Sequence, residues 1–283
     1  MSLTVDEKTC RLCACSDRAS VNIHRAHGGN SLLENKRYNI VRILRQYGME
    51  TLSTLVHRTL RHYDQEALLY VKNLVTSALL ECCSVEEFKE LKQTDSVNCI
   101  AEKSYEDLLV FSQKDPAAGG DPLYIAKNYT SYAAVLHYRV AHWVHMNHRP
   151  NACHSAAQSL AASISRRGKM LSGAEIDFRS RIGSRFVIDH GVGTVIGETT
   201  VIGNDCYILG GVTLGARGIS SNGAVPRHPK IGNHVQIGAF ANVLGNVSVG
   251  DGAFIGPGCV ITRDVPSGAR VQVKTSLQVQ LPE

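Results

Sequence analysis

Aliphatic residues recur at a spacing of six through the C-terminal part of the chain. These residues are Ile176, Ile182, Ile188, Ile196, Ile202, Ile208, Leu214, Ile231, Ile237, Val243, Val249, Ile255 and Ile261. A helix repeats near 3.6 residues and a half-buried strand near 2, so neither explains this period. The pattern predicts a triangular parallel β-helix, in which each six-residue unit forms one face and three units complete a coil.

A small residue, most often glycine, follows most of these aliphatic positions, as in the segments IGS, IGE, IGN and VGD. The aliphatic side chain is expected to point into a prism too narrow for a larger group. The glycine is expected to relieve a corner where the backbone needs dihedral angles that other residues avoid.

Helical periodicity characterises the chain before residue 170. Apolar residues three and four apart favour helices in these segments: 38–62, 65–80, 105–112, 123–148 and 153–165. Glycine content changes at the same point, because 6 of the 25 glycines lie in residues 1–170 and 19 in residues 171–283. The predicted fold class is therefore α+β and multidomain, with an N-terminal all-helical domain followed by a C-terminal parallel β-helix.

These two patterns also give the expected domain boundaries. They are a cysteine-containing tail at 1–35, a helical domain at 36–170, a β-helix at 171–268 with an inserted loop at 215–230, and a C-terminal tail at 269–283. The β-helix is expected to be the catalytic domain, because the irregularities described next fall within it.

The composition is that of a globular protein, since 43% of the 283 residues are hydrophobic and 19% are charged. The net charge of +5 is dispersed without basic runs, so no nucleic-acid partner is expected. Lys72 interrupts the most apolar stretch and the N-terminus has no leader pattern, so no membrane partner is expected. Nine cysteines without a regular framework indicate reduced thiols and a cytoplasmic location.

The six-residue period breaks at two places, and each break contains a histidine. The step from Ile188 to Ile196 is two residues too long and contains His190. The step from Leu214 to Ile231 contains eleven inserted residues and His228. A solenoid accommodates insertions as loops at its outer corners, and such loops commonly form the binding face. The two breaks are therefore the candidate sites of chemistry.

Several segments around these breaks resemble serine acetyltransferases, which are hexapeptide-repeat acyltransferases with a left-handed β-helix. The resemblance covers about residues 105–268 and rests on the runs KDPAA, YRVAHW, EIDFRSRIG, IDHGVGTVIGETTVIG, GVTLG and RHPKIG. It implies transfer of the acetyl group from the co-substrate acetyl-CoA to the hydroxyl of L-serine, which gives O-acetylserine and CoA.

The resemblance also assigns roles to individual residues. His190 matches the general base, and Glu175 matches its acidic partner, with Asp177 as the alternative. His228 matches a second catalytic histidine at the acceptor site. Arg227 matches the residue that binds the serine carboxylate, a role that suits the planar guanidinium. The remaining substrate-binding residues are Asp115, Asp189 and Asp177, of which the first two match acids around the serine ammonium.

Acetyl-CoA is expected to lie along the prism between two subunits. The residues expected to bind it are Gly215, Ala216, Arg217, Lys230, Gly238, Ala239 and Gly256. A homotrimer or a dimer of trimers is expected, since the family assembles in this way and flat prism faces leave apolar surface exposed.

The chain departs from the family at three points. It lacks the AGxPA-type stretch and ends in Glu283 rather than isoleucine, so no stable complex with cysteine synthase is expected. Val225 and Pro226 replace the usual acidic residue before Arg227, which leaves another hydroxy amino acid such as homoserine open as the acceptor.

A second class of enzyme stays open at this point. Some β-helix trimers are zinc enzymes of the γ-carbonic anhydrase type, and His190, His228 and His234 loosely imitate their ligands. The contexts of the first two histidines fit an acyltransferase better, so no metal is expected, and the CRLCAC segment near the N-terminus is off the common zinc spacing. Glu198 is expected to be a solvated corner residue.

Overall fold

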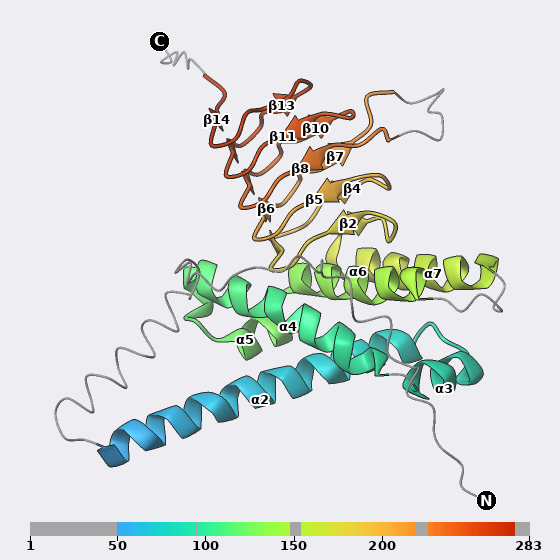
Figure 1. Cartoon of the computed structure of the whole chain (residues 1–283), viewed down its shortest axis with the longest axis vertical. Coiled ribbons are helices and arrows are strands. Elements are labelled where there is room, and N and C mark those ends of the chain that lie inside the picture. Colours follow the sequence, from blue (N-terminus) through green and yellow to red (C-terminus); the bar gives the residue numbers. More distant parts are fainter. Residues whose placement is uncertain (1–49, 94, 148–153, 219–225, 275–283) are drawn as a thin grey trace, which may run out of the picture.

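The computed structural model describes residues 50–93, 95–147, 154–218 and 226–274, and shows a group of helices beneath a three-faced solenoid (Figure 1). The helices are α2 Glu50–Leu80, α3 Val85–Gln93, α4 Ser96–Lys114, η1 Pro116–Ala118, α5 Pro122–Asn128, α6 Thr130–Met146 and α7 His154–Ser172. None of the described helices is both long enough and apolar enough to cross a membrane. The expected N-terminal tail, 1–35, lies outside the described residues, as do residues 275–283 of the expected C-terminal tail, 269–283.

Parallel strands of two or three residues form the three faces of the solenoid. The first face contains β1 Glu175–Ile176, β4 Val195–Ile196, β7 Thr213–Gly215, β10 Asn242–Leu244 and β13 Val260–Ile261. The second contains β2 Arg181–Ile182, β5 Val201–Ile202, β8 Lys230–Ile231 and β11 Ser248–Val249. The third contains β3 Val187–Asp189, β6 Tyr207–Leu209, β9 Gln236–Ile237, β12 Phe254–Ile255 and β14 Arg270–Val271.

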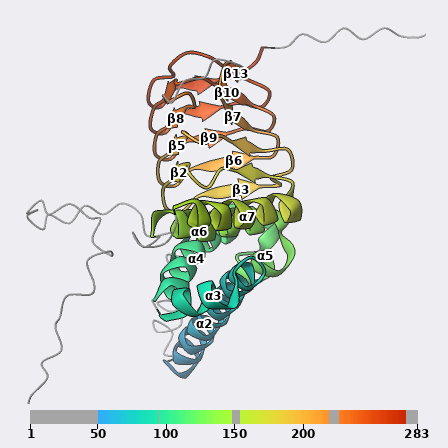
Figure 2. The same cartoon turned by 90° about the vertical axis from the view of Figure 1, so that its right-hand side faces the viewer.

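This architecture confirms the predicted fold class. All thirteen aliphatic residues of the six-residue pattern are buried and belong to one hydrophobic core inside the prism. The coils stack in parallel register, as Figure 2 shows, so that Ile176 pairs with Ile196 and Ile188 with Ile208. The solenoid continues to β14, slightly beyond the expected end at residue 268.

The glycines after the aliphatic residues are required for a different reason from the expected one. Gly183, Gly203 and Gly232 have no positive φ; instead, a Cβ added to each would lie 2.3–2.7 Å from an atom of the next coil. The positive φ angles fall later, on Arg185, Asp205 and other corner residues. These glycines therefore permit the coils to stack closely. The corners do not depend on the conformational freedom of these glycines.

The helical part differs from the expected segments in three ways. Helix α2 runs without interruption through residues 62–65, where the pattern suggested a break, and α3 was not predicted. The expected helix at 123–148 is two helices, α5 and α6, because Tyr129 between them is extended, with φ of −98° and ψ of 112°. The part of the first expected segment before residue 50 lies outside the described residues.

Helix α6 covers the open end of the prism, and α7 lies beside it across the base (Figure 2). Ala134, Val135 and Tyr138 of α6 complete the core of the solenoid from below. Gly168 on α7 permits the close approach of these helices, since a Cβ there would lie 2.6 Å from the Cβ of His137. Helix α7 ends at Gly173, whose φ of 72° is the left-handed conformation that terminates many helices.

A buried ion pair joins the helices to the first coil. Arg139 of α6 makes two hydrogen bonds to the carboxylate of Asp107 on α4, at 2.8 and 3.0 Å. The guanidinium also donates to the carbonyl oxygens of Ile182 and Gly183, and Asp107 accepts from the backbone N–H of Phe186. Both charged side chains are at most 5% exposed. Every strong polar group of the pair therefore has a partner, which is the condition for tolerating buried charges.

Replacing Arg139 by Met is expected to lower the free energy of unfolding by about 3–5 kcal/mol, because Asp107 becomes a buried charge without a counterion. Chemical denaturation measures the effect. The control is Arg185→Met, which removes an ion pair to Asp205 whose arginine is 42% exposed. That variant should lose at most about 1 kcal/mol. Equal losses in both variants would contradict the assigned importance of the buried pair.

Candidate active site

A pocket of about 400 Å³ lies where the helices meet the third face of the solenoid. It is lined by Asp115, Ala117, Asn128, Tyr129, Thr130, Ser131, Asp189 and His190. Three of the residues singled out in the sequence, Asp115, Asp189 and His190, are thus brought together from segments more than 70 positions apart. Its volume suits a small molecule.

Asp115 lies on the helical side of this pocket. Its Oδ1 accepts a hydrogen bond from the backbone N–H of Ala117 at 2.9 Å, so it caps η1. Its Oδ2 accepts from the hydroxyl of Tyr129 at 2.6 Å, and this bond raises the pKa of Tyr129 to about 12. Capping of η1 accounts for the position of Oδ1, and the hydroxyl of Tyr129 orients Oδ2 toward the pocket.

Asp189 lies on the solenoid side, at the end of β3. Its Oδ2 accepts a hydrogen bond from the hydroxyl of Tyr207 on β6 at 2.8 Å. Burial and this bond raise the pKa of Tyr207, so the tyrosine stays a donor. Two carboxylates, each held by a tyrosine hydroxyl, thus face one pocket, an arrangement that suits a cationic group such as an ammonium.

His190 follows directly and has φ of 63°, in the left-handed region. Its side chain is 82% exposed, and Nε2 lies 3.9 Å from Oδ1 of Asp189, which is too far for a hydrogen bond. Gly191 beyond it packs on Ser131, since a Cβ there would lie 3.2 Å from the Cβ of Ser131. The tight turn thus projects the imidazole into the pocket mouth, where a ligand can reach it.

His228 lies at a different corner and is 7% exposed. The backbone N–H of Thr199 donates to its Nδ1 at 3.1 Å, and the Thr199 hydroxyl lies 2.8 Å from the same nitrogen. Burial, followed by the charge of Arg227, lowers the pKa of His228. Because Nδ1 accepts a backbone N–H, the neutral ring carries its proton on Nε2, which makes that nitrogen a hydrogen-bond donor.

Gly197 supplies the space for this ring. A Cβ at position 197 would lie 2.2 Å from both Nε2 and Cδ2 of His228, so only glycine fits. The hydroxyl oxygen of Thr199 also accepts from the backbone N–H groups of Arg227 and His228, at 3.0 and 3.1 Å. Thr199 and Gly197 together fix the orientation of the second histidine.

Arg227 belongs to an ion-pair network at the same corner. Its guanidinium contacts Oε2 of Glu198 at 2.5 Å, and Arg179 contacts the other oxygen, Oε1, at 3.0 Å. Arg179 also holds both oxygens of Asp177. The prediction that Glu198 is a solvated corner residue is therefore wrong, because two cations from neighbouring coils share its carboxylate.

Glu175 is on β1, and its described contact is with Lys169 Nζ at 2.5 Å. It lines a different cavity from the one that contains His190, together with Asp177 and Arg179. Within one chain, then, the acid nearest to His190 among the described ion pairs is Asp189 rather than Glu175.

The residues expected to bind acetyl-CoA fall on two corners. Gly238, Ala239 and Gly256 lie above His190 on the corner that also contains residues 190–193 and 210–211, which we name the His190 corner. Gly215 ends β7, and Ala216 and Arg217 lie on the corner that contains residues 177–180, 197–200 and 226–229, which we name the His228 corner. Lys230 follows this corner on β8. Arg217 lies over Gly245, with Nε 3.4 Å from the carbonyl oxygen of Leu244.

The two corners are the two edges of the first face. The chain passes from the His190 corner through β4 to the His228 corner, so one face of the prism separates the two histidines. Asp189 and His190 lie at the first corner. At the second corner, Arg227 and His228 lie beside the carboxylates of Asp177 and Glu198.

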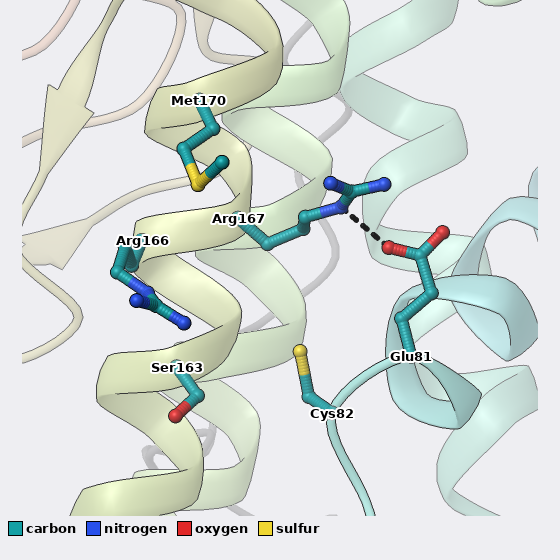
Figure 3. Close-up of a pocket in the computed structure, with 6 residues that line it drawn as sticks. All are labelled: Glu81, Cys82, Ser163, Arg166, Arg167 and Met170. Atoms are coloured by element: carbon teal, nitrogen blue, oxygen red, sulfur yellow. Dashed lines mark hydrogen bonds and ion pairs between the residues drawn. The ribbon is translucent and has the colours of Figure 1, made fainter.

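Another cavity, of about 500 Å³, lies between the end of α2 and helix α7. Figure 3 shows Arg167 paired with Glu81 across it, at 2.5 Å, with Cys82 and Arg166 nearby. Burial, the largest cause, raises the pKa of Cys82, which makes its thiol a poorer nucleophile. The described lining residues include no histidine, so the His190 pocket is the better candidate for acyl transfer.

Sequence reasoning missed four residues that organise the site: Tyr129, Tyr207, Thr199 and Gly197. Val187 pairs with Tyr207, which fixes a register of twenty residues between the first two coils. With that register, Asp189 pairs with Leu209, and Tyr207 is two residues before Leu209. Tyr207 therefore lies beside Asp189 on the same outward side of the sheet. Tyr129 gave no such signal, because its position depends on the break between α5 and α6.

Comparisons with known proteins identify relatives of this chain. The pattern described as bacterial transferase hexapeptide (six repeats) matches residues 228–263. A serine acetyltransferase of Synechococcus elongatus is 39% identical over 165 residues, which cover 58% of this chain and 63% of that relative. A serine acetyltransferase of Escherichia coli K12 is 33% identical over 220 residues, which cover 76% of this chain and 75% of that one.

A solved structure shows the same fold. Soybean serine acetyltransferase complexed with serine matches with a TM-score of 0.58 at 31% identity, and the match covers 70% of this chain and 79% of that chain. The solenoid thus has the fold of the hexapeptide-repeat transferases. The chain belongs to the serine acetyltransferase family. It spans less than two thirds of the length of the Synechococcus relative.

These relatives do not favour the zinc-enzyme alternative. In one chain, His190, His228 and His234 lie on three different corners, since His234 follows the second face rather than the third or the first. Among the residues that the structure describes, no three His, Cys, Asp or Glu side chains are grouped to hold a metal ion. The CRLCAC segment lies outside the described residues.

Replacing Thr199 by Val is expected to raise the pKa of His228, because the variant loses a hydroxyl that donates to the neutral ring at Nδ1. Nuclear magnetic resonance titration of the histidines measures it, with His228→Gln assigning the signal. The control Thr199→Ser keeps the hydroxyl and should keep the wild-type pKa. The linked effect on stability has a definite sign: because folding lowers the His228 pKa, stability falls as pH drops below the unfolded value of about 6.5. An unchanged His228 pKa in Thr199→Val would contradict the assigned hydrogen bond.

Proposed function

We propose that this protein transfers the acetyl group of acetyl-CoA to the hydroxyl of L-serine, giving O-acetylserine and CoA. The observation that carries the proposal is the pocket in which His190 lies beside two carboxylates, each held by a tyrosine hydroxyl. Membership of the serine acetyltransferase family and a similar enzyme complexed with serine support the choice of acceptor.

In this proposal, Asp115 and Asp189 bind the ammonium of serine and bring its hydroxyl to His190. The imidazole takes the hydroxyl proton as the oxygen attacks the thioester carbonyl. The tetrahedral intermediate collapses, the carbon–sulfur bond breaks, and the imidazolium returns the proton to the departing CoA thiolate. No covalent enzyme intermediate is needed, because the acceptor oxygen attacks the donor directly.

The described residues that line the His190 pocket of one chain include no arginine or lysine to pair with the serine carboxylate. Arg227 and the Nε2–H of His228 are suited to this role, but they lie across the first face. In a homotrimer, the His190 corner of one copy can face the His228 corner of the next, and a threefold ring closes this head-to-tail contact. We therefore propose that each site is shared between two copies.

Glu175 and Asp177 also border the first face, so a neighbouring copy brings them toward the same shared site. The role of Glu175 as the partner of His190 stays a prediction, and its ion pair with Lys169 has to open for it. Asp177 is the weaker candidate, because Arg179 occupies both of its oxygens. A cytoplasmic location, a dimer of trimers and the lack of a stable cysteine synthase complex likewise stay predictions.

His190→Ala is expected to lower kcat by about 10²- to 10⁴-fold, because the serine hydroxyl loses its general base. Release of free CoA thiol from acetyl-CoA with L-serine measures turnover. The matched control is His234→Ala, which removes an exposed histidine that also has a positive φ, at 56°, but at another corner. Wild-type turnover by His190→Ala would exclude the mechanism. Faster turnover with L-homoserine than with L-serine would keep the chemistry and change the acceptor.

Co-expression of two inactive variants tests the shared site. Mixed trimers contain His190→Ala subunits and Arg227→Ala subunits. An interface has both functional residues when the Arg227→Ala subunit contributes its intact His190 and the His190→Ala subunit contributes its intact Arg227. Random assembly places this pair at about one quarter of the interfaces, so about one quarter of the wild-type activity should return. Mixing the purified variants without exchange of subunits is the control. If co-expressed trimers are as inactive as their parents, both residues act within one chain.

A further inference from the structure

Phe240 is a large apolar residue in an unusual setting. It has φ of 61°, in the left-handed region, and it is 70% exposed. The other described non-glycine residues with positive φ are all polar: Arg185, His190, Asp205 and His234. A bulky side chain is disfavoured in this conformation, and an exposed ring gains little from core packing. Neither backbone preference nor burial explains why the corner has an aromatic residue.

The ring of Phe240 covers a glycine of the coil below. A Cβ added to Gly211 would lie 2.4 Å from Cδ1 of the ring, so only a glycine at that position leaves room for it. The backbone N–H of Phe240 donates to the carbonyl oxygen of Gly210 at 3.0 Å. The ring is therefore held over the Gly210–Gly211 turn by its own backbone.

His190 lies on the other side of the same turn. A Cβ added to Gly210 would lie 3.5 Å from the Cβ of His190, and Gly211 donates to the carbonyl oxygen of Val192 at 2.9 Å. His190, the two glycines and Phe240 thus follow one another on three consecutive coils along the His190 corner.

Only one direction along this corner is open to a long substrate. Toward the helices, Ser131 packs against Gly191, and the pocket with Asp115 and Asp189 takes the acceptor. Away from the helices, the corner continues over Gly211 and past Phe240 to Ala239, whose carbonyl oxygen accepts from Gly258. A donor whose thioester lies at His190 has to extend along this second path.

Resting on the proposed function, we propose that Phe240 is a binding residue for the acyl donor, and that its ring packs against the pantetheine arm of a CoA thioester. The arm alternates methylene groups with amides, so it offers apolar segments to an aromatic face. The glycines beneath it bring the backbone close to the arm without a side chain between them. The exposed ring of Phe240 supplies a side wall along this corner.

The test replaces Phe240 by Gly, which accepts a positive φ without strain. Loss of the ring is expected to raise KM for acetyl-CoA roughly tenfold, while kcat and KM for L-serine stay at wild-type values. The matched control is His234→Gly, which makes the same backbone change in the same coil at another corner. An unchanged donor KM in Phe240→Gly, or an equal rise in the control, overturns the proposal.

Truncated donors identify which part of CoA meets the ring. Acetyl-pantetheine retains the arm, whereas the acetyl thioester of N-acetylcysteamine lacks most of it. The KM increase is expected with acetyl-CoA and acetyl-pantetheine and is expected to disappear with the short thioester. An increase confined to acetyl-CoA would place the ring on the adenine nucleotide and overturn the assignment to the arm.

Two further measurements separate this proposal from its alternatives. Sedimentation velocity compares the assembly of wild type and Phe240→Gly; dissociation of the variant would make Phe240 a subunit contact and overturn the proposal. Titration calorimetry with CoA measures donor affinity without any acceptor. If no hydroxy amino acid is acetylated but Phe240→Gly still weakens CoA binding, the proposed acceptor fails and the donor contact stands.

Discussion

The arrangement of the site depends on how the helices close the lower end of the solenoid. The first coil has no coil beneath it, so its backbone groups need other partners. Arg139 takes the carbonyl oxygens of Ile182 and Gly183, and the Tyr138 hydroxyl pairs with Ser180 and Ile182. The buried charge of Arg139 is in turn balanced by Asp107. This polar seam fixes α4 and α6 on the coil, and it thereby holds Asp115 opposite Asp189.

The six-residue period predicted the solenoid well because one constraint, a narrow prism, acts on every coil alike. The inward position tolerates only an aliphatic side chain, so the pattern is visible in the sequence without knowledge of the contacts. The helices were predicted less well. The hydrogen bond from the Tyr129 hydroxyl to Asp115 and the close approach of Gly168 to His137 are both tertiary effects, which the local pattern of the chain does not show. The glycines after the aliphatic residues were placed correctly but explained incorrectly, since stacking between coils is not visible along one coil.

Candidate chemistry was visible in the sequence where it interrupts the repeat, as it does at His190 and His228. Residues that contact these histidines from a neighbouring coil leave the six-residue repeat intact, so the sequence pattern does not reveal them. Thr199 and Gly197 are in perfect register, yet Thr199 determines which nitrogen of His228 carries the proton and Gly197 leaves room for the ring. Glu198 looked like a solvated corner for the same reason, since its two arginine partners come from other coils.

A solenoid also explains why its polar groups lie at its corners. Inward positions are occupied by the core, so only the corners and the outward positions can carry chemistry, and a convex corner touches a ligand from one side. A pocket needs a second wall. For the acceptor, the helices supply it through Asp115, and a neighbouring copy is suited to supply the cationic groups. For a donor that runs along the corner beyond the helices, a side chain that projects from the corner can supply the second wall, and the exposed ring of Phe240 is in that position.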